Sequence, residues 1–159
     1  MSNIEDKLKK MGLNLPQTHP YISPNRTHGV QVGNILYLSG HGSGRVLTEE
    51  GIKSHGKVGA EVTEEEAYKT ARAVALIMIS AIKECVEDLD RVKRVIRLLG
   101  MVNSAPGFNR HFAVIDGASD LFYEVWGPEF GQHARAAVGV AGLPRDGVLE
   151  IMGEFEIHG

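Results

Sequence analysis

The order of elements that the sequence predicts indicates an α+β fold, in which two long helices cover one face of a mixed sheet. Two local signals are the clearest. A capping box at Thr63 and Glu66 begins a long run of apolar residues at helical spacing, and two β-favouring runs flank Gly33-Asn34, as in a β-hairpin. The periodicity of the other segments completes the order β-β-α-β-α-β-β, after an N-terminal helix and an extended arm.

Composition excludes several classes of protein. The chain has 159 residues, is 43% hydrophobic and carries a net charge of −3, which fits a single folded domain. An acidic balance argues against nucleic-acid binding, and the one cysteine, Cys85, cannot form an internal disulfide. No apolar run approaches a membrane span of about 20 residues, and the charged start is unlike a secretory signal. We therefore expect a cytoplasmic protein without a membrane partner.

The N-terminal segment is expected to be distinct from the rest of the chain. Residues 1–28 are predicted to form a helix and a proline-rich arm, and residues 29–159 a single domain. Apolar residues at helical spacing predict the helix over Asn3–Met11. Leu13–Thr27 has a proline every four residues, which excludes a helix and favours an extended arm: Pro16, Pro20 and Pro24.

The first half of the domain is expected to hold a hairpin and a helix. Strands are predicted over Gly29–Val32 and Ile35–Leu38. The glycine-rich run Gly40–Gly44 predicts unusual backbone angles where the second strand ends, and Arg45–Val62 predicts a loop with a short edge strand. A helix of about 22 to 25 residues follows Thr63.

The second half is expected to begin with a long strand, Arg91–Asn103, that is apolar on both faces. One face would contact the helices, and a subunit interface would cover the other, since the chain has no spare helix. A helix is predicted over Asn109–Trp126, ended by Gly127-Pro128. Two further strands are predicted over Ala134–Ala141 and Val148–Ile157.

Arg135 is a candidate for binding an anion. It lies in a strand of small apolar residues, where a charge requires a partner, and Ala137 and Gly139 share its side of the strand. The space beside them would suit a small carboxylate, which arginine binds through two parallel hydrogen bonds. The alternative is a structural ion pair or a charge on an edge strand.

Glu150 is the candidate carboxylate near Arg135. If the last two strands form a hairpin, Glu150 lies across it, and it would orient a water molecule or hold Arg135. The register of that hairpin decides whether the two side chains share a face, because a one-residue shift reverses every side chain. The alternative is an ordinary solvated carboxylate.

Two further features of the sequence bear on possible sites. The segment Ser39–Gly42 could present backbone N–H groups to an anion, or could be a glycine-rich turn. The seven histidines show no metal-binding spacing and are predicted to lie in loops or at the surface, so no metal site is expected.

Several motifs, in this order, resemble those of the reactive intermediate deaminase family, also called the YjgF or endoribonuclease L-PSP-like family. The resemblance covers about Gly29 to Ile157. It rests on four runs with the long helix between the first two. The runs are Gly33–Gly40 in the hairpin, Arg91–Val95, Ala134–Pro144 and Leu149–Ile151. The longer arm and the segment Gly100–Pro106 are similar to a divergent, chorismate-mutase-like branch of that family.

The resemblance implies a chorismate-mutase-like fold and a homotrimer with pockets between subunits. It also implies a reaction, the hydrolysis of enamine and imine acids such as 2-aminoacrylate to 2-keto acids and ammonia, with no metal or organic cofactor. Arg135 matches the family arginine that holds the substrate carboxylate, and Glu150 matches the glutamate near the attacking water. Ser39 and Gly40 match a pair that lines the pocket.

The chain departs from the family pattern around these residues. Arg26 stands where the family has a pocket tyrosine, and Ala137 stands where it has a cysteine. The family asparagine aligns near Ala105-Pro106, and Asn103 is the nearest polar substitute, together with Ser104. The departures favour a second hypothesis, a non-catalytic trimer that binds a small acidic metabolite. A ribonuclease, an activity attributed to some relatives, is a third, and chorismate mutase is a fourth that rests on the fold name alone.

Overall fold

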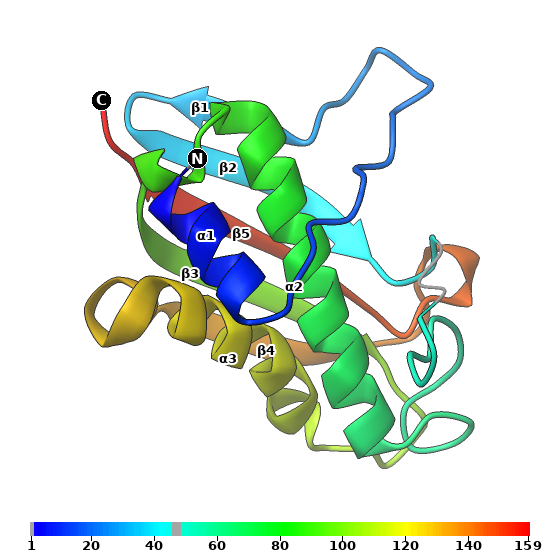
Figure 1. The fold of residues 1–159 in the computed structure, drawn as a ribbon. Helices are drawn as coiled ribbons and strands as arrows, with labels where there is room; N and C mark the ends of the chain where they lie inside the picture. Colours follow the sequence, from blue (N-terminus) through cyan, green and yellow to red (C-terminus); the bar gives the residue numbers. More distant parts are fainter. Residues whose placement is uncertain (1, 46–48) are drawn as a thin grey trace.

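A five-stranded mixed sheet with helices on one of its faces forms the protein, as Figure 1 shows. The structure is a computed structural model that describes residues 2–45 and 49–159. The strand order is β1-β2-β5-β3-β4, in which only β3 and β4 are parallel. The strands are β1 (Gly29–Val32), β2 (Ile35–Gly42), β3 (Val92–Asn103), β4 (Ala134–Val140) and β5 (Leu149–Ile157). The predicted α+β class and element order are confirmed.

Three α-helices lie on the covered face: α1 (Asn3–Lys10), α2 (Glu64–Val86) and α3 (His111–Phe130). The α2 helix has 23 residues, within the predicted length, and Thr63 caps it by accepting a hydrogen bond from the Glu66 backbone N–H at 3.1 Å. Gly127, with φ of 79°, ends the regular part of α3 as predicted, but one more turn follows it. Among the described residues, no helix combines the length and apolarity that crossing a bilayer requires.

The hydrophobic core lies between the sheet and the α2–α3 pair. Its largest fully buried side chains include Met78 of α2, Phe122 of α3 and Phe155 of β5. Leu8 of α1 is only 1% exposed and belongs to the same core, so the N-terminal helix is packed onto the sheet domain. The arm, residues Leu13–Thr27, then crosses to β1 without regular structure, as predicted.

Strand β2 corrects the prediction for its glycine-rich end. It continues through Gly42 instead of ending at Leu38, and a β-bulge interrupts its pairing with β5 between Leu38 and His41. Gly40, Gly42 and Gly44 do not have positive φ angles, so the expected unusual backbone is absent at all three. They are close to other residues instead: a Cβ on Gly44 would lie 2.6 Å from the Pro144 carbonyl oxygen. Close approach therefore explains these glycines.

The segment after β2 also differs from its prediction. Within described residues 49–62 the chain forms isolated bridges, such as Val58 with Val62, and no strand. Residues 46–48, which belong to the predicted loop, lie outside the described residues.

The predicted hairpin between the last two strands is wrong. Strand β4 pairs in parallel with β3, and β3 lies between β4 and β5. A short 3-10 turn, Pro144–Asp146, belongs to the connection that passes from β4 to β5. Because β3 is the longest strand and is rich in apolar residues, it takes an inner position, where both of its edges are paired.

The face of the sheet opposite the helices carries exposed apolar side chains. Five of them are between 37% and 62% exposed: Val30, Val32, Tyr37, Val138 and Met152. Their neighbours along the strands, such as Leu36 and Ile151, are buried in the core, which places the five on the open face. On β3 itself, Leu99 and Met101 pair with Met152 and Glu150 on this face and are half-buried, which agrees with the two-sided apolar strand expected from the sequence. That a partner subunit covers this face stays a prediction.

The contact between α2 and α3 should be the part of the fold most sensitive to an added methyl group. A Cβ on Gly117 would overlap the Tyr68 carbonyl oxygen and lie 3.2 Å from the Ala71 Cβ. We expect Gly117→Ala to lower the free energy of unfolding by about 2–3 kcal/mol, measured by urea denaturation. Gly142→Ala is the control, because nothing lies within 4 Å of its added methyl group. Equal stability of the two variants would contradict this packing.

Candidate functional site

A pocket of about 530 Å³ opens at the edge of the sheet, where β2 extends past its pairing with β1. Strand β1 pairs only with residues 35–38 of β2, so the end of β2 has a free edge. The pocket is lined there by the arm, by β2, by the turn before β5 and by Glu150 of β5. Of the residues predicted from the sequence, it brings together Arg26, Ser39, Gly40 and Glu150.

Ser39 holds the arm against β2. Its hydroxyl donates a hydrogen bond to the Thr27 carbonyl oxygen at 2.6 Å, and its backbone N–H donates to the His28 carbonyl oxygen at 2.7 Å. Farther along the arm, the Thr18 hydroxyl donates to the Glu84 carboxylate of α2. Ser39 therefore lines this pocket, but its hydroxyl is already engaged with the backbone of the arm.

Glu150 and Gly40 are in direct contact. A Cβ on Gly40 would lie 3.1 Å from the Glu150 Cδ and 3.2 Å from its Oε2, so the glutamate occupies the space that a side chain there would need. Glu150 is the one carboxylate among the described residues that line the pocket. In the described part of the chain its carboxylate forms neither an ion pair nor a hydrogen bond. Its oxygens are therefore available to a ligand or to water.

Two buried histidines that line the pocket, His28 and His41, form a hydrogen-bonded pair. His28 Nδ1 lies 2.9 Å from His41 Nε2, and His41 Nδ1 lies 2.8 Å from the Ser39 carbonyl oxygen. Because a carbonyl only accepts, His41 Nδ1 carries a hydrogen, and in the neutral ring His41 Nε2 accepts from His28 Nδ1–H. Burial, with the neighbouring His28 as a further cause, lowers the pKa of His41 to about 4. His41 is therefore neutral at physiological pH.

The prediction that histidines lie in loops or at the surface is wrong for His41, which lies in β2 and is 8% exposed. His28 lies in the bend before β1, as predicted, but it too is buried, at 6% exposed. For His41 the bulge in β2 is the reason, since it shifts the alternation of side chains and turns His41 toward the interior. His28 also lies 4.8 Å from the Tyr21 ring, and its Nε2 is 4.0 Å from Glu84 Oε2. The sequence contains no signal for the bulge and hence none for the pair.

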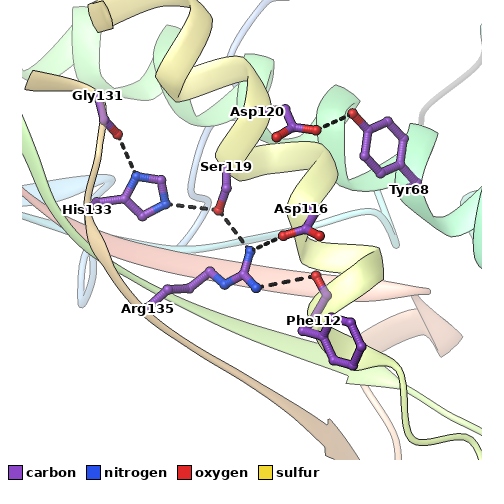
Figure 2. Close-up of polar contacts among 8 residues, drawn as sticks. All are labelled: Tyr68, Phe112, Asp116, Ser119, Asp120, Gly131, His133 and Arg135. Atoms are coloured by element: carbon purple, nitrogen blue, oxygen red, sulfur yellow. Dashed lines mark hydrogen bonds and ion pairs between the residues drawn. The ribbon is translucent and has the colours of Figure 1, made fainter. Parts of the chain in front are cut away.

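Arg135 lies outside this pocket, on the helix side of the sheet, as Figure 2 shows. Its guanidinium donates to Asp116 Oδ1 at 2.8 Å, to Ser119 Oγ at 3.0 Å and to the Phe112 carbonyl oxygen at 3.3 Å. The Arg135 side chain is 20% exposed and that of Asp116 is 47% exposed. Within one chain, Arg135 therefore forms the structural ion pair that the sequence left open as an alternative.

His133 extends the Arg135 network. Its Nδ1 lies 2.7 Å from the Gly131 carbonyl oxygen and its Nε2 lies 2.9 Å from Ser119 Oγ (Figure 2). Burial lowers the pKa of His133, and the positive charge of Arg135 adds to the effect. The neutral ring donates to Gly131 and accepts from the Ser119 hydroxyl, which leaves the Ser119 lone pairs for Arg135.

The structure separates Arg135 from Glu150. Arg135 pairs with Leu98, whose side chain is buried under the helices, whereas Glu150 pairs with Met101 on the open face. Strand β3 lies between them. Ala137 shares the helix side with Arg135 and packs against the core. One chain alone therefore does not join the two residues to which the resemblance gives the main roles.

Asn103 is fully buried and does not line the pocket, but it supports a turn that does. Its Nδ2 donates to Asp146 Oδ1 at 3.2 Å and to the Gly147 carbonyl oxygen at 3.1 Å, while Lys57 Nζ donates to its Oδ1 at 2.7 Å. The turn also contains Arg145, which has a positive φ of 57°. A left-handed backbone is unfavourable for arginine, so these hydrogen bonds compensate for the strain.

Three arginines line the pocket, and sequence reasoning singled out only the first of them: Arg26, Arg45 and Arg145. Arg45 carries no recognisable local signal. Arg145 lies in the turn that the sequence predicted, five residues before Glu150, but a turn arginine is usually solvated. Their gathering depends on the contact between the end of β2 and the turn before β5. Within the described residues, no group of His, Cys, Asp or Glu side chains has the arrangement of a metal site.

Comparisons with known proteins find one family along nearly the whole chain. A family model described as "YjgF/chorismate mutase-like, putative endoribonuclease" matches residues 5–155. Protein TCP17 of Trypanosoma cruzi is 38% identical over 151 residues, which cover 95% of this chain and 92% of that protein.

Solved structures agree with this match. The protein Atu1372 of Agrobacterium tumefaciens is 36% identical with a TM-score of 0.84, over 98% of this chain and 92% of that one. A "putative endoribonuclease" of Shewanella oneidensis MR-1 is 28% identical with a TM-score of 0.87, over 97% and 99% of the two chains.

Lowering the pH from 7 to 5 should destabilise the protein by about 2 kcal/mol through His41 alone. In the unfolded chain the imidazole takes up a proton near the ordinary pKa of 6.5, whereas in the folded protein it does so only near about 4. The unfolded state therefore binds more protons in this range, and stability falls as the pH falls. Urea denaturation at both pH values would measure the difference.

The comparison variant is His41→Gln, whose amide can still donate to the Ser39 carbonyl oxygen. Between pH 7 and pH 5, the free energy of unfolding of this variant should fall by about 2 kcal/mol less than that of the wild type. His158→Gln is the matched control, since it makes the same replacement at an exposed histidine near the C-terminus. The same pH dependence in the wild type and His41→Gln would contradict the assignment.

Proposed function

The chain belongs to the YjgF/chorismate mutase-like family, and on that premise we propose that it hydrolyses reactive enamine and imine acids to 2-keto acids and ammonia. The observation that carries the proposal is Glu150, an unpaired carboxylate in a pocket whose other charged or titratable lining groups are arginines, histidines and Tyr21. An acidic substrate is attracted by the arginines, and the carboxylate is positioned to act on water.

The reaction requires few catalytic groups from the pocket. The C2 carbon of an imino acid is already electrophilic, so orientation of the acid and delivery of water account for most of the catalysis. Glu150 accepts a proton from water as the water oxygen bonds to C2 and passes it to the imine nitrogen, which gives a carbinolamine. Glu150 then accepts the proton of the carbinolamine hydroxyl and passes it to the nitrogen, as the C–N bond breaks and the C=O bond forms. The products are a 2-keto acid and ammonia, and Glu150 ends in its starting state. An enamine substrate first tautomerises to the imine.

The proposal places the complete site between two protomers of a homotrimer. Strand β4, which carries Arg135, and the β2 end of the sheet lie on opposite sides of β3 and β5. Head-to-tail packing of identical chains brings such opposite surfaces together, and three copies close a ring. A substrate carboxylate would then replace Asp116 as the partner of Arg135. The exposed apolar side chains of the open sheet face support a trimer, since association would bury them.

A non-catalytic binding protein for a small acidic metabolite is the alternative. The engagement of Ser39 with the arm and the substitution of Ala137 for the family cysteine favour it, because both change the surroundings of the reacting atoms. Binding without turnover would distinguish this alternative. A ribonuclease agrees with the description of the family but not with the net charge of −3.

Replacing Glu150 should remove turnover. An amino-acid oxidase generates imino acids, semicarbazide traps them, and hydrolysis by the protein lowers the trapped signal. We expect Glu150→Gln to reduce the rate by about 100-fold or more, as for loss of a general base. Glu154→Gln is the matched control, since Glu154 lies on the same strand and face but is paired with Arg97 at 2.8 Å. Full activity of Glu150→Gln would reject the mechanism.

Mixing two inactive variants tests whether the site lies between subunits. Arg135→Ala should fold and lose activity, and refolding it together with Glu150→Gln at equal amounts should restore about a quarter of the wild-type rate. That fraction follows because random association in a cyclic trimer leaves about one interface in four with both residues intact. Light scattering should report a trimer throughout. A monomer, or no recovery on mixing, would rule out a shared site.

A further inference from the structure

The pocket carries an excess of positive charge that the hydrolysis of a simple imino acid does not require. Arg26, Arg45 and Arg145 line it, against the single carboxylate of Glu150. Among the residues that the structure describes, none forms an ion pair with these three guanidinium groups. The whole chain has a net charge of −3, so this basic lining is a local feature.

The three arginines reach the pocket from separate segments of the chain. Arg26 of the arm lies over the Tyr21 ring, with its Cζ 4.9 Å from the ring centre. A Cβ on Gly44, the residue before Arg45, would lie 3.2 Å from the Arg145 Cβ, so the two segments that carry Arg45 and Arg145 are in contact. Asn103 holds the Arg145 turn through its bonds to Asp146 and Gly147.

Gathering three positive charges around a single carboxylate is unfavourable, and an anion bound in the pocket would offset that cost. Arginine is also the side chain best suited to bind carboxylate or phosphate oxygens in pairs. The volume, about 530 Å³, lies within the range of roughly 300–1,000 Å³ typical for ligands larger than a three-carbon acid. Charge and size therefore both indicate a larger anion than 2-iminopropionate.

We propose that the pocket binds a metabolite with two anionic groups, so that the preferred substrate is an imino acid bearing a second carboxylate or a phosphate. The hydrolysis step rests on the function proposed above, whereas the binding preference does not. Glu150 stands beside the reacting carbon, and Arg45 and Arg145 receive the distal anionic group. Arg135 of a neighbouring subunit would hold the carboxylate next to the imine.

Calorimetric titration with 2-keto acids, the products of such a reaction, tests the preference directly. The probes are 2-oxobutyrate, with one carboxylate, 2-oxoglutarate, with two, and 3-phosphohydroxypyruvate, with a carboxylate and a phosphate. We expect at least one of the two dianionic probes to bind about tenfold tighter than 2-oxobutyrate, as one added charge-assisted contact would give. Comparing the two identifies the distal group as carboxylate or phosphate.

Two pocket variants and one outside the pocket decide whether the arginines cause the preference. Arg45→Gln and Arg145→Gln should each reduce the ratio of affinities at least fivefold. Arg94→Gln is the control, because Arg94 lies on β3 and donates to the Glu129 carbonyl oxygen at 2.8 Å, away from the pocket lining. Equal binding of all three probes, or a ratio that survives both pocket variants, would overturn the proposal.

The semicarbazide assay separates this inference from the proposed function. If the protein binds the probes with two anionic groups more tightly but does not hydrolyse imino acids, the inference stands and the proposed function is rejected. Turnover without any dianionic preference in the titrations would retain hydrolysis and reject the inference.

Discussion

The β-bulge in β2 is the local irregularity on which the candidate site depends. It separates the register at Leu38 from that at His41, turns His41 toward the interior and leaves Gly40 against Glu150. His41 then fixes the tautomer of His28, and Ser39 fastens the arm. In a regular strand without the bulge, the side chains after Leu38 would alternate without interruption, and His41 would point to the opposite face of the sheet. The pocket exists because one strand departs from regular pairing at its free edge.

The position of β3 has a comparable effect on the whole sheet. By lying between β4 and β5, it keeps Arg135 and Glu150 apart. The pairing of Arg135 with Leu98 and of Glu150 with Met101 places the two side chains on opposite faces. Arg135 then takes Asp116 as its partner within the chain. The same arrangement leaves an apolar sheet face uncovered. An oligomer in which one copy completes the pocket of the next would account for both features, which is why the proposed function requires a trimer.

Asn103 does not line the pocket, but it stabilises a turn that does. Its alignment suggested a polar group in the lining, yet the structure has it fully buried behind the turn that carries Arg145. The three arginines of the lining reach it from the arm, from the residues after β2 and from that turn. The basic character of the pocket therefore depends on contacts among segments far apart in the chain.

The sequence by itself determined the elements that local chemistry controls. The capping box and helical spacing fixed α2, the Gly33-Asn34 turn fixed the first hairpin, and three prolines kept the arm out of a helix. The family motifs led to Glu150, Gly40 and Ser39, which the structure brings into one pocket. Only the tertiary structure decided the strand order, the bulge, the His28–His41 pair and the ion pair of Arg135. Each of these depends on which distant strands and turns meet, and a shift of one residue in pairing exchanges the two faces of a strand, so no local pattern could specify them.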